Sequence, residues 1–247
     1  MNALANKIKI HLDLTKQYDA VAAINRMAGN YIVPTTETAL HQLNKIILPE
    51  VRETLDGLIA EDEHEIRDGV GDILFTVAGL YARLGYAFPE SIIVPTHLKY
   101  TREEAALSTL TLMGVCEEAA TLVAIHGLEA YGEKLNAHME TMLRIACRIG
   151  HMHGYPVEQD LQAVVDSNFT KFDKTEDDAW QTKAKYSQLG VDTEYHQASY
   201  EGTKLYVTKV ATAGKGSDGK NYPAGKWVKS VNFKEPVYSS LVEVASA

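Results

Sequence analysis

The segment from residue 69 to residue 88 constrains the fold of this chain more than any other part. It carries only two charged residues, Asp72 and Arg83, and its apolar residues fall on every side of a helix. A helix that is apolar all round has to be covered by other parts of the protein. We therefore expect a buried central helix, ending near Leu84, with further helices packed around it.

Most of the chain shows the three- and four-residue spacing of apolar side chains that predicts helices. The expected helices lie at residues 1–30, 36–60, 65–84, 101–149, 156–172 and 175–189, the fourth broken near Gly127 or Gly132. Beyond Gly190 the pattern changes to short alternating segments at 193–196, 204–210 and 226–231, separated by turns. The sequence predicts a mainly α protein with a helical domain at 1–190 and a small β-hairpin tail at 191–247 packed on it.

Composition excludes several classes of protein. No apolar run reaches the roughly 18 to 20 residues of a membrane helix, and the first residues lack an apolar signal core. We expect a soluble, cytoplasmic protein with no membrane partner, in the host cytoplasm if a virus encodes it. The net charge of −9 argues against nucleic acid as a partner, because phosphates need a basic surface. Cys116 and Cys147 lie in apolar helical contexts and are expected to be free thiols.

Carboxylates gather on two successive predicted helices. Glu50 and Glu53 lie three residues apart on the first, and Glu65, Asp68 and Asp72 fall within an arc of roughly 60° on the second. The short connection favours an antiparallel hairpin in which the two faces meet. Most acidic runs are simply solvated faces of helices, and that alternative has to be weighed for each of these residues.

Asp72 is the hardest of them to explain as a solvated residue, because its segment is expected to be buried. An ionised carboxylate there needs a cation or hydrogen-bond donors, since leaving it unpaired costs several kcal/mol. Arg83 lies about 16 Å further along the helix, too far to pair with it. A metal ion is the better account, and hard oxygen ligands select Mg²⁺, Mn²⁺ or Ca²⁺ over zinc. A di-iron site is not expected, because the Glu-x-x-His spacing occurs only at residues 61–64.

The acidic helices resemble those of the all-α nucleoside triphosphate pyrophosphatases, the MazG-like superfamily that includes phosphoribosyl-ATP pyrophosphohydrolases. The resemblance rests on ExxE at 50–53 and on ExxDGxxD at 65–72, which runs into an apolar helix. Residues 165–179 are similar to the SNxSKF helix, and residues 219–236 to the GKxxKSxxFxxP tail, of members carried by bacterial viruses. Pro49 replaces a glutamate that many members have and predicts a kink or restart of its helix. Gly69 occupies the glutamate position that other branches have in the second motif, so that Glu65 and Asp68 would take over its role.

The resemblance implies a helical bundle of this family and a Mg²⁺-dependent hydrolase, with Mn²⁺ able to substitute. Its substrate would be a nucleoside triphosphate, expected to be deoxy, cleaved to the monophosphate and pyrophosphate for control of the nucleotide pool. The implied metal ligands are Glu50, Glu53, Glu65, Asp68 and Asp72, and Glu50 or Glu53 would be the catalytic base.

The resemblance also implies substrate contacts. Asn168, Lys171 and Lys174 would bind the nucleotide, with the two lysines on one helical face, although surface lysines often serve only solubility. Weaker candidates for contacts with the base are Asn25, His41 and Asn44. His151 and His153 lie in a predicted turn, where we expect them to face solvent.

Two other functions stay open. One is a non-catalytic helical module that binds nucleotides or a partner protein, and the other is a hydrolase of phosphoribosyl-ATP. The apolar faces of residues 101–149 also predict a homodimer or homotetramer.

Overall fold

The computed structural model describes residues 8–96 and 100–239 of the 247-residue chain. These residues form two compact units. The first comprises the described residues of the ranges 1–22, 31–164 and 238–247, and the second comprises residues 23–30 and 165–237. The domain boundary predicted at residue 190 falls inside the second unit, and the predicted division into domains stays a prediction.

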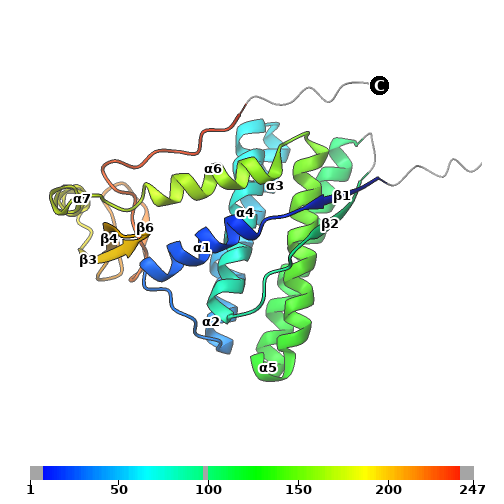
Figure 1. The fold of residues 1–247 in the computed structure, drawn as a ribbon, viewed down its shortest axis with the longest axis horizontal. Coiled ribbons are helices and arrows are strands. Elements are labelled where there is room, and N and C mark those ends of the chain that lie inside the picture. The colour runs from blue at the N-terminus through cyan, green and yellow to red at the C-terminus, as the bar shows by residue number, and fades with distance from the viewer. Residues whose placement is uncertain (1–7, 97–99, 240–247) are drawn as a thin grey trace, which may run out of the picture. The chain divides into compact units, whose positions relative to one another are not determined.

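The first unit is mainly helical. Its elements are β1 (Ile8–Leu12), the start of α1 (Thr15–Met27), α2 (Thr36–His41), the π-helix η1 (Gln42–Ile47), α3 (Leu48–Ala60), α4 (Glu63–Leu84), β2 (Ile92–Thr96), α5 (Arg102–Met152) and the first part of α6 (Val157–Phe169). The predicted central helix is α4, which contacts α2, η1, α3 and α5 (Figure 1). Ile73, Leu74 and Leu80 are almost completely buried, as expected for a helix that is apolar all round.

Helix α5 is two helices joined at Gly127. That residue has φ 74° and ψ 161°, a backbone conformation that breaks the helix and that glycine adopts readily. A capping box formed by Thr101 and Glu104 starts the first half. The two halves run side by side in Figure 1, next to α3 and α4. The predicted mainly α class and the predicted break are confirmed, while the specific bundle of the MazG-like family stays a prediction.

Within the described residues, α5 is long and apolar enough to cross a membrane by length and composition alone. This differs from the sequence prediction, which expected no apolar run long enough to cross a membrane. The helix is interrupted at Gly127, and Leu112, Val123 and Leu135 on its inner side are fully buried. Of its most apolar 18-residue stretch, 39 % is buried within the described residues.

The predicted helix at 36–60 is present in three consecutive parts, α2, η1 and α3. Pro49 lies in the first turn of α3, where a missing N–H costs least. The α-helix thus restarts at this proline after a wider π turn, as Pro49 predicted.

One predicted helix was wrong at its start. Residues 8–12 form β1, which pairs antiparallel with β2, with Leu12 opposite Ile92. Helix α1 begins only at Thr15, whose backbone N–H donates to Asp13 Oδ1 at 3.0 Å. Ile92 and Val94 are buried while Ile93 between them is exposed, so β2 follows the two-residue period of a strand.

The second unit contains the ends of α1 and α6, followed by α7 (Glu176–Gln188) and the strands β3 (Thr193–Tyr200), β4 (Thr203–Val210), β5 (Gly214–Lys215) and β6 (Asn221–Tyr222). Strands β3 and β4 form a hairpin whose two turn residues, Glu201 and Gly202, both have positive φ. The predicted small antiparallel strands near the C-terminus are confirmed. Tyr186 of α7 packs with Val191, Val210, Tyr222 and Val228, so this β segment shares a core with a helix.

Two predicted elements of the second unit were wrong. Residues 226–231 form no regular strand and pair with β4 only at an isolated bridge between Lys209 and Trp227. Helix α6 ends at Phe169 instead of residue 172. The chain leaves the helix because Asp173 exchanges two backbone hydrogen bonds with Tyr206, at 2.9 and 2.8 Å.

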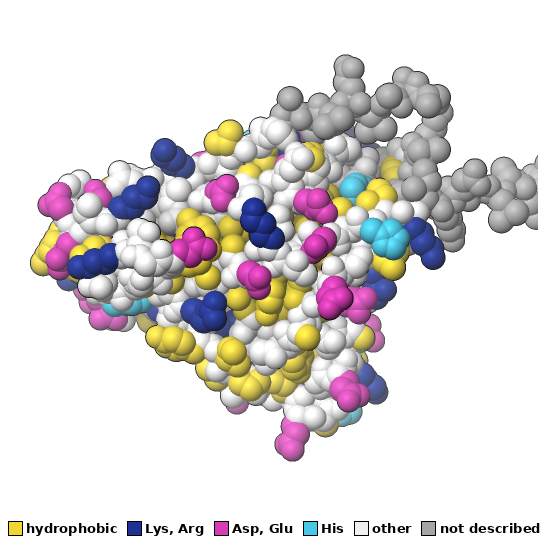
Figure 2. Space-filling view, viewed as in Figure 1, with side chains coloured by type: hydrophobic (Ala, Val, Ile, Leu, Met, Phe, Trp, Pro, Cys, Tyr) yellow, Lys and Arg dark blue, Asp and Glu magenta, His cyan; other side chains and the backbone are white. Residues whose placement is uncertain are grey.

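The surface mixes charges of both signs. Acidic and basic side chains are interspersed on the face that Figure 2 shows. On α5, Leu107, Leu110 and Ile125 are exposed apolar side chains.

Candidate functional site

The α3–α4 hairpin is packed closely at two glycines. A methyl group added to Gly69 would lie 3.1 Å from Thr54 Cβ, and one added to Gly57 would lie 3.1 Å from Glu65 Cβ. Both helices rise by the same distance per residue and run in opposite directions, so that moving one residue earlier in α3 corresponds to moving one residue later in α4. Glu50 is therefore level with Asp72, as the prediction of two facing acidic helices requires.

The predicted metal ligands differ in their exposure. Glu50, Asp68 and Asp72 are partly buried, whereas Glu53 and Glu65 are exposed. In the parts of the chain that the structure describes, no group of three or more His, Cys, Asp or Glu side chains is placed to hold a metal ion. The hairpin brings the five carboxylates to one part of the first unit without closing them into a coordination shell.

The expectation that Asp72 is buried was wrong. Its neighbours Gly71 and Ile73 are buried, but Asp72 lies on the side of α4 that is only partly covered. The helix is apolar enough to predict burial of the segment as a whole, but only the packing decides which side stays open. The cost of an unpaired buried charge is therefore a weaker argument for a metal here.

Arg67 is a central residue of the site that sequence reasoning missed. It is 8 % exposed, and it donates from Nε and Nη2 to Asp160 Oδ2 and Oδ1 at 2.7 and 2.6 Å. The guanidinium lies 5.5 Å from the ring centre of Tyr155 and 4.8 Å from that of Tyr238. Its position directly before Asp68 was a signal that a cation lies near the acidic residues, but the sequence prediction named only Arg83 as a possible partner of Asp72.

Tyr238 covers the same carboxylates from the C-terminal segment. Its hydroxyl donates to Asp68 Oδ1 at 2.5 Å, and Arg67 Nη1 donates to the Ser239 carbonyl at 2.7 Å. Burial raises the pKa of Tyr238, and the nearby charges of Asp68, Asp72 and Asp160 raise it further. The hydroxyl therefore keeps its proton and acts as a donor. No sequence motif indicated this residue.

Asn168 and Lys171 lie together in the second unit. Lys171 Nζ donates to Asn168 Oδ1 at 2.7 Å, and Asn168 is 5 % exposed. Lys174 does not lie on one helical face with Lys171, which corrects the prediction. Because α6 ends at Phe169, both lysines follow the helix, and Lys174 is exposed.

The two virus-type motifs converge around Phe233. The ammonium of Lys171 is 6.0 Å from the centre of the Phe233 ring, and that of Lys229 is 4.2 Å from it. Ser167 Oγ donates to the Lys234 carbonyl at 2.8 Å, which ties the first motif to the second. Lys229 also pairs with Glu235 at 2.9 Å. Lys229 is thus the second cation beside Lys171, a role that the sequence prediction gave to Lys174.

His151 and His153, at the C-terminal end of α5, do not face solvent freely, which corrects another expectation. Helix α5 continues through Met152, and His153 caps it. Burial lowers the pKa of His151. The His153 side chain is 13 % exposed. Of the weaker candidates, Asn25 belongs to the second unit, and His41 and Asn44 are exposed.

Comparison with known proteins gives one relative and no family. The chain is 24 % identical over 253 residues to an uncharacterized protein of Acanthamoeba polyphaga mimivirus, an alignment that covers 92 % of this chain and 95 % of that protein. No family model matches the chain, and no solved structure matches it. The similarity points to a viral relationship and carries no statement about chemistry.

Proposed function

We propose that the chain is a Mg²⁺-dependent nucleoside triphosphate diphosphatase of the all-α pyrophosphatase type, which cleaves a (d)NTP to the monophosphate and pyrophosphate. The observation that carries the proposal is the close packing of α3 on α4 at Gly57 and Gly69, which brings Glu50 level with Asp72. A hairpin of this kind can offer hard oxygen ligands from two helices to one metal ion.

The donor chemistry suits Mg²⁺. The proposed ligands are Glu50, Glu53, Glu65, Asp68 and Asp72. Glutamate side chains have several rotamers, so that those of α3 can turn toward α4 without movement of the backbone. The bidentate pair with Asp160 already neutralises Arg67, so that this cation does not saturate the proposed ligands. When bound, the metal would neutralise phosphate charge and lower the pKa of a water molecule.

The chain's own groups would divide the remaining work. Glu50 or Glu53 would accept the proton of the attacking water. Tyr238, kept protonated, donates a hydrogen bond to Asp68 and so orients one proposed ligand. Ordered second partners of this kind fix the position of a ligand carboxylate.

The proposed phosphate contacts rest on the second unit by itself. Lys171 donates a hydrogen bond to Asn168 at 2.7 Å, and the ammonium groups of Lys171 and Lys229 both lie near the Phe233 ring. Ammonium groups can bind phosphate oxygens as point charges, and Lys229 would exchange its carboxylate partner Glu235 for phosphate. Lys174 keeps a place in the proposal only as an exposed, mobile charge.

The assembly and location of the protein are part of the same proposal. Leu107, Leu110 and Ile125 leave apolar area on the outer side of α5, which supports a homodimer or homotetramer. We place the enzyme in the cytoplasm, of the host if a virus encodes it.

The experiment that tests the proposal measures pyrophosphate release from the eight common ribo- and deoxyribonucleoside triphosphates and from phosphoribosyl-ATP. Mg²⁺, Mn²⁺ and excess chelator are compared. We expect release with either metal, none with chelator, and a loss of at least about a hundredfold in Asp72→Asn and in Glu53→Ala. Glu129→Gln, at an exposed position of α5, is the matched control.

Failure to cleave any triphosphate at high protein concentration would remove the enzyme proposal and leave a non-catalytic binding module. Cleavage of phosphoribosyl-ATP alone would identify the other hydrolase.

A further inference from the structure

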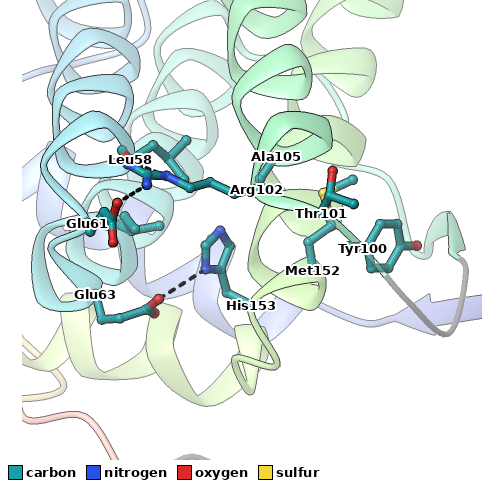
Figure 3. Close-up of a pocket in the computed structure, with 10 residues that line it drawn as sticks. Leu58, Glu61, Glu63, Tyr100, Thr101, Arg102, Ala105, Met152 and His153 are labelled. Carbon is teal, nitrogen blue, oxygen red and sulfur yellow. Dashed lines mark hydrogen bonds and ion pairs between the residues drawn. The ribbon is translucent and has the colours of Figure 1, made fainter.

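The first unit contains a cavity of about 260 Å³ at the end of α4 opposite Leu84. The two ends of α5 meet the turn between α3 and α4 there (Figure 3). The floor of the cavity is apolar and consists of Leu58, Ile66, Ala105 and Met152. The first three of these belong with Tyr155 to a buried cluster, so that the floor is part of a packed core. A flat apolar ring would find a preformed surface here.

The described lining residues of the cavity include one arginine, Arg102, whose guanidinium already has hydrogen-bond and ion-pair partners. Arg102 Nε donates to the Leu58 carbonyl at 3.0 Å, and Nη2 donates to the Leu58 and Ile59 carbonyls. Nη1 is paired with Glu61. Arg102 thus caps the C-terminal end of α3, where unpaired carbonyls carry negative partial charge. The Arg102 guanidinium is therefore not available to a phosphate from this wall.

The other polar wall presents hydrogen-bond acceptors. His153 Nδ1 lies 3.6 Å from Glu63 Oε1, and its ring stacks on Tyr155 with centres 5.3 Å apart. The contact of 3.6 Å sets the His153 ring beside the Glu63 carboxylate without a hydrogen bond between them. Figure 3 shows the His153 ring below the Arg102 side chain, with one ring nitrogen toward Glu63 and the other toward Arg102. A ligand that offers an N–H donor at the edge of an apolar ring matches the Glu63 carboxylate.

The cavity and the acidic face share helix α4. Glu63 precedes Asp68 by five residues, a rise of about 7.5 Å along the axis. Five residues also turn the helix by about 140° beyond a full turn, so that the two carboxylates point to different sides of α4. Tyr155 connects the two places, because its hydroxyl donates to Glu63 and its ring lies 5.5 Å from the Arg67 guanidinium.

We propose that this cavity binds the base of the nucleotide and selects bases with an amino group at position 4 of a pyrimidine or position 6 of a purine, cytosine and adenine, over thymine and uracil, which have a carbonyl there. The amino group would donate to Glu63, and a carbonyl in its place would meet the carboxylate with no hydrogen to share. The proposal rests on the proposed function for the presence of a nucleotide, but the chemistry of the cavity alone sets the preference. The Glu63 side chain is 64 % exposed, so that water pairs with the carboxylate when the base offers no hydrogen, and the expected preference is moderate.

The test is ligand-observed NMR of the full chain, without metal, with deoxycytidine, deoxyadenosine, thymidine and deoxyuridine. We expect the two amino-bearing nucleosides to bind about tenfold more tightly than the other two, the ratio that corresponds to about 1.4 kcal/mol for one unmatched polar group. Glu63→Gln should reduce the ratio to about threefold or less, because an amide can donate as well as accept. Glu129→Gln should leave it unchanged, and thermal melting checks that each variant is folded.

A second variant fills the cavity. Met152→Trp should weaken all four nucleosides together, because Met152 is part of the floor. Equal binding of thymidine and deoxycytidine to the unmodified chain, or no binding of any nucleoside, would overturn the proposal. Because no hydrolysis is measured, a chain that prefers deoxycytidine but cleaves no triphosphate would refute only the enzyme. A chain that cleaves all triphosphates equally and shows no nucleoside preference would refute only the base pocket.

Discussion

Replacing Gly69 by alanine puts a methyl group against the backbone of α3, 3.1 Å from Thr54 Cβ and 3.2 Å from Thr54 Cα, and well inside contact distance of Thr54 Oγ1. Carbon atoms pack best at about 3.5 to 4.0 Å, so that α3 has to move away from α4 by roughly half an ångström or more. Overpacking of this kind costs about 1 to 3 kcal/mol, and the better helix propensity of alanine returns up to about 1 kcal/mol. We expect a net loss of about 1 to 2 kcal/mol in the free energy of unfolding.

Gly114→Ala is the matched control, because that glycine is an exposed residue of α5 with no atom near the added methyl group. It should stabilise the chain by about 0.5 to 1 kcal/mol through helix propensity and reduced freedom of the unfolded chain. Urea unfolding followed by circular dichroism measures both variants. Under the proposed function, Gly69→Ala should also lower kcat/KM, since it separates Glu50 from Asp72.

A double variant tests the cause. Thr54→Ala removes the hydroxyl nearest to the new methyl group, so that Gly69→Ala should cost less in that background than in the unmodified chain. Close packing of α3 on α4 at Gly69 is refuted if Gly69→Ala is as stable as Gly114→Ala. It is also refuted if the effects of Thr54→Ala and Gly69→Ala on the free energy of unfolding are additive.

Three further predictions concern named contacts. Arg67→Ala leaves the buried carboxylate of Asp160 without its partner and should cost about 3 to 5 kcal/mol in urea unfolding, whereas an effect below about 1 kcal/mol would contradict the buried pair. Tyr238→Phe removes the hydrogen bond to Asp68 and should cost about 1 kcal/mol, and an unchanged unfolding midpoint would show that the C-terminal segment does not rest on α4. Burial raises the pKa of Asp173 in the folded protein above the ordinary value of 3.8 that it has in the unfolded chain. The free energy of unfolding is therefore highest below pH 3.8 and falls as the pH rises through the folded pKa, because the folded protein has to bury a charge. Asp173→Asn stays neutral, so its urea unfolding midpoint should rise relative to that of the unmodified chain as the pH increases from 4 to 7. A difference between the two midpoints that does not change with pH would exclude the titration of Asp173.

The helices were predicted best where the pattern is long and its ends carry caps. Helix α4 begins after Asp62, whose side chain accepts from the N–H groups of His64 and Glu65, and it ends at Gly85 with positive φ. Gly127 likewise breaks α5 within the predicted range. Such signals act within a few residues, which is why they can be read from the chain alone.

The errors lie where distant parts of the chain decide the backbone. Residues 8–12 are a strand because residues 92–96 pair with them, and α6 stops at Phe169 because Tyr206 pairs with Asp173. Residues 226–231 have an alternating pattern, but their hydrogen bonds to β4 are too few for a strand. No local propensity contains these partners.

The candidate site divides in the same way. The sequence by itself determined that five carboxylates occupy one stretch of two successive helices, because helical geometry depends only on the spacing of residues. Only the tertiary structure decided that Asp72 is partly exposed, that Asp160 holds Arg67, and that Tyr238 donates to Asp68. These contacts join residues 93 and 170 positions apart, and such pairings follow from how the helices pack rather than from any periodicity along the chain.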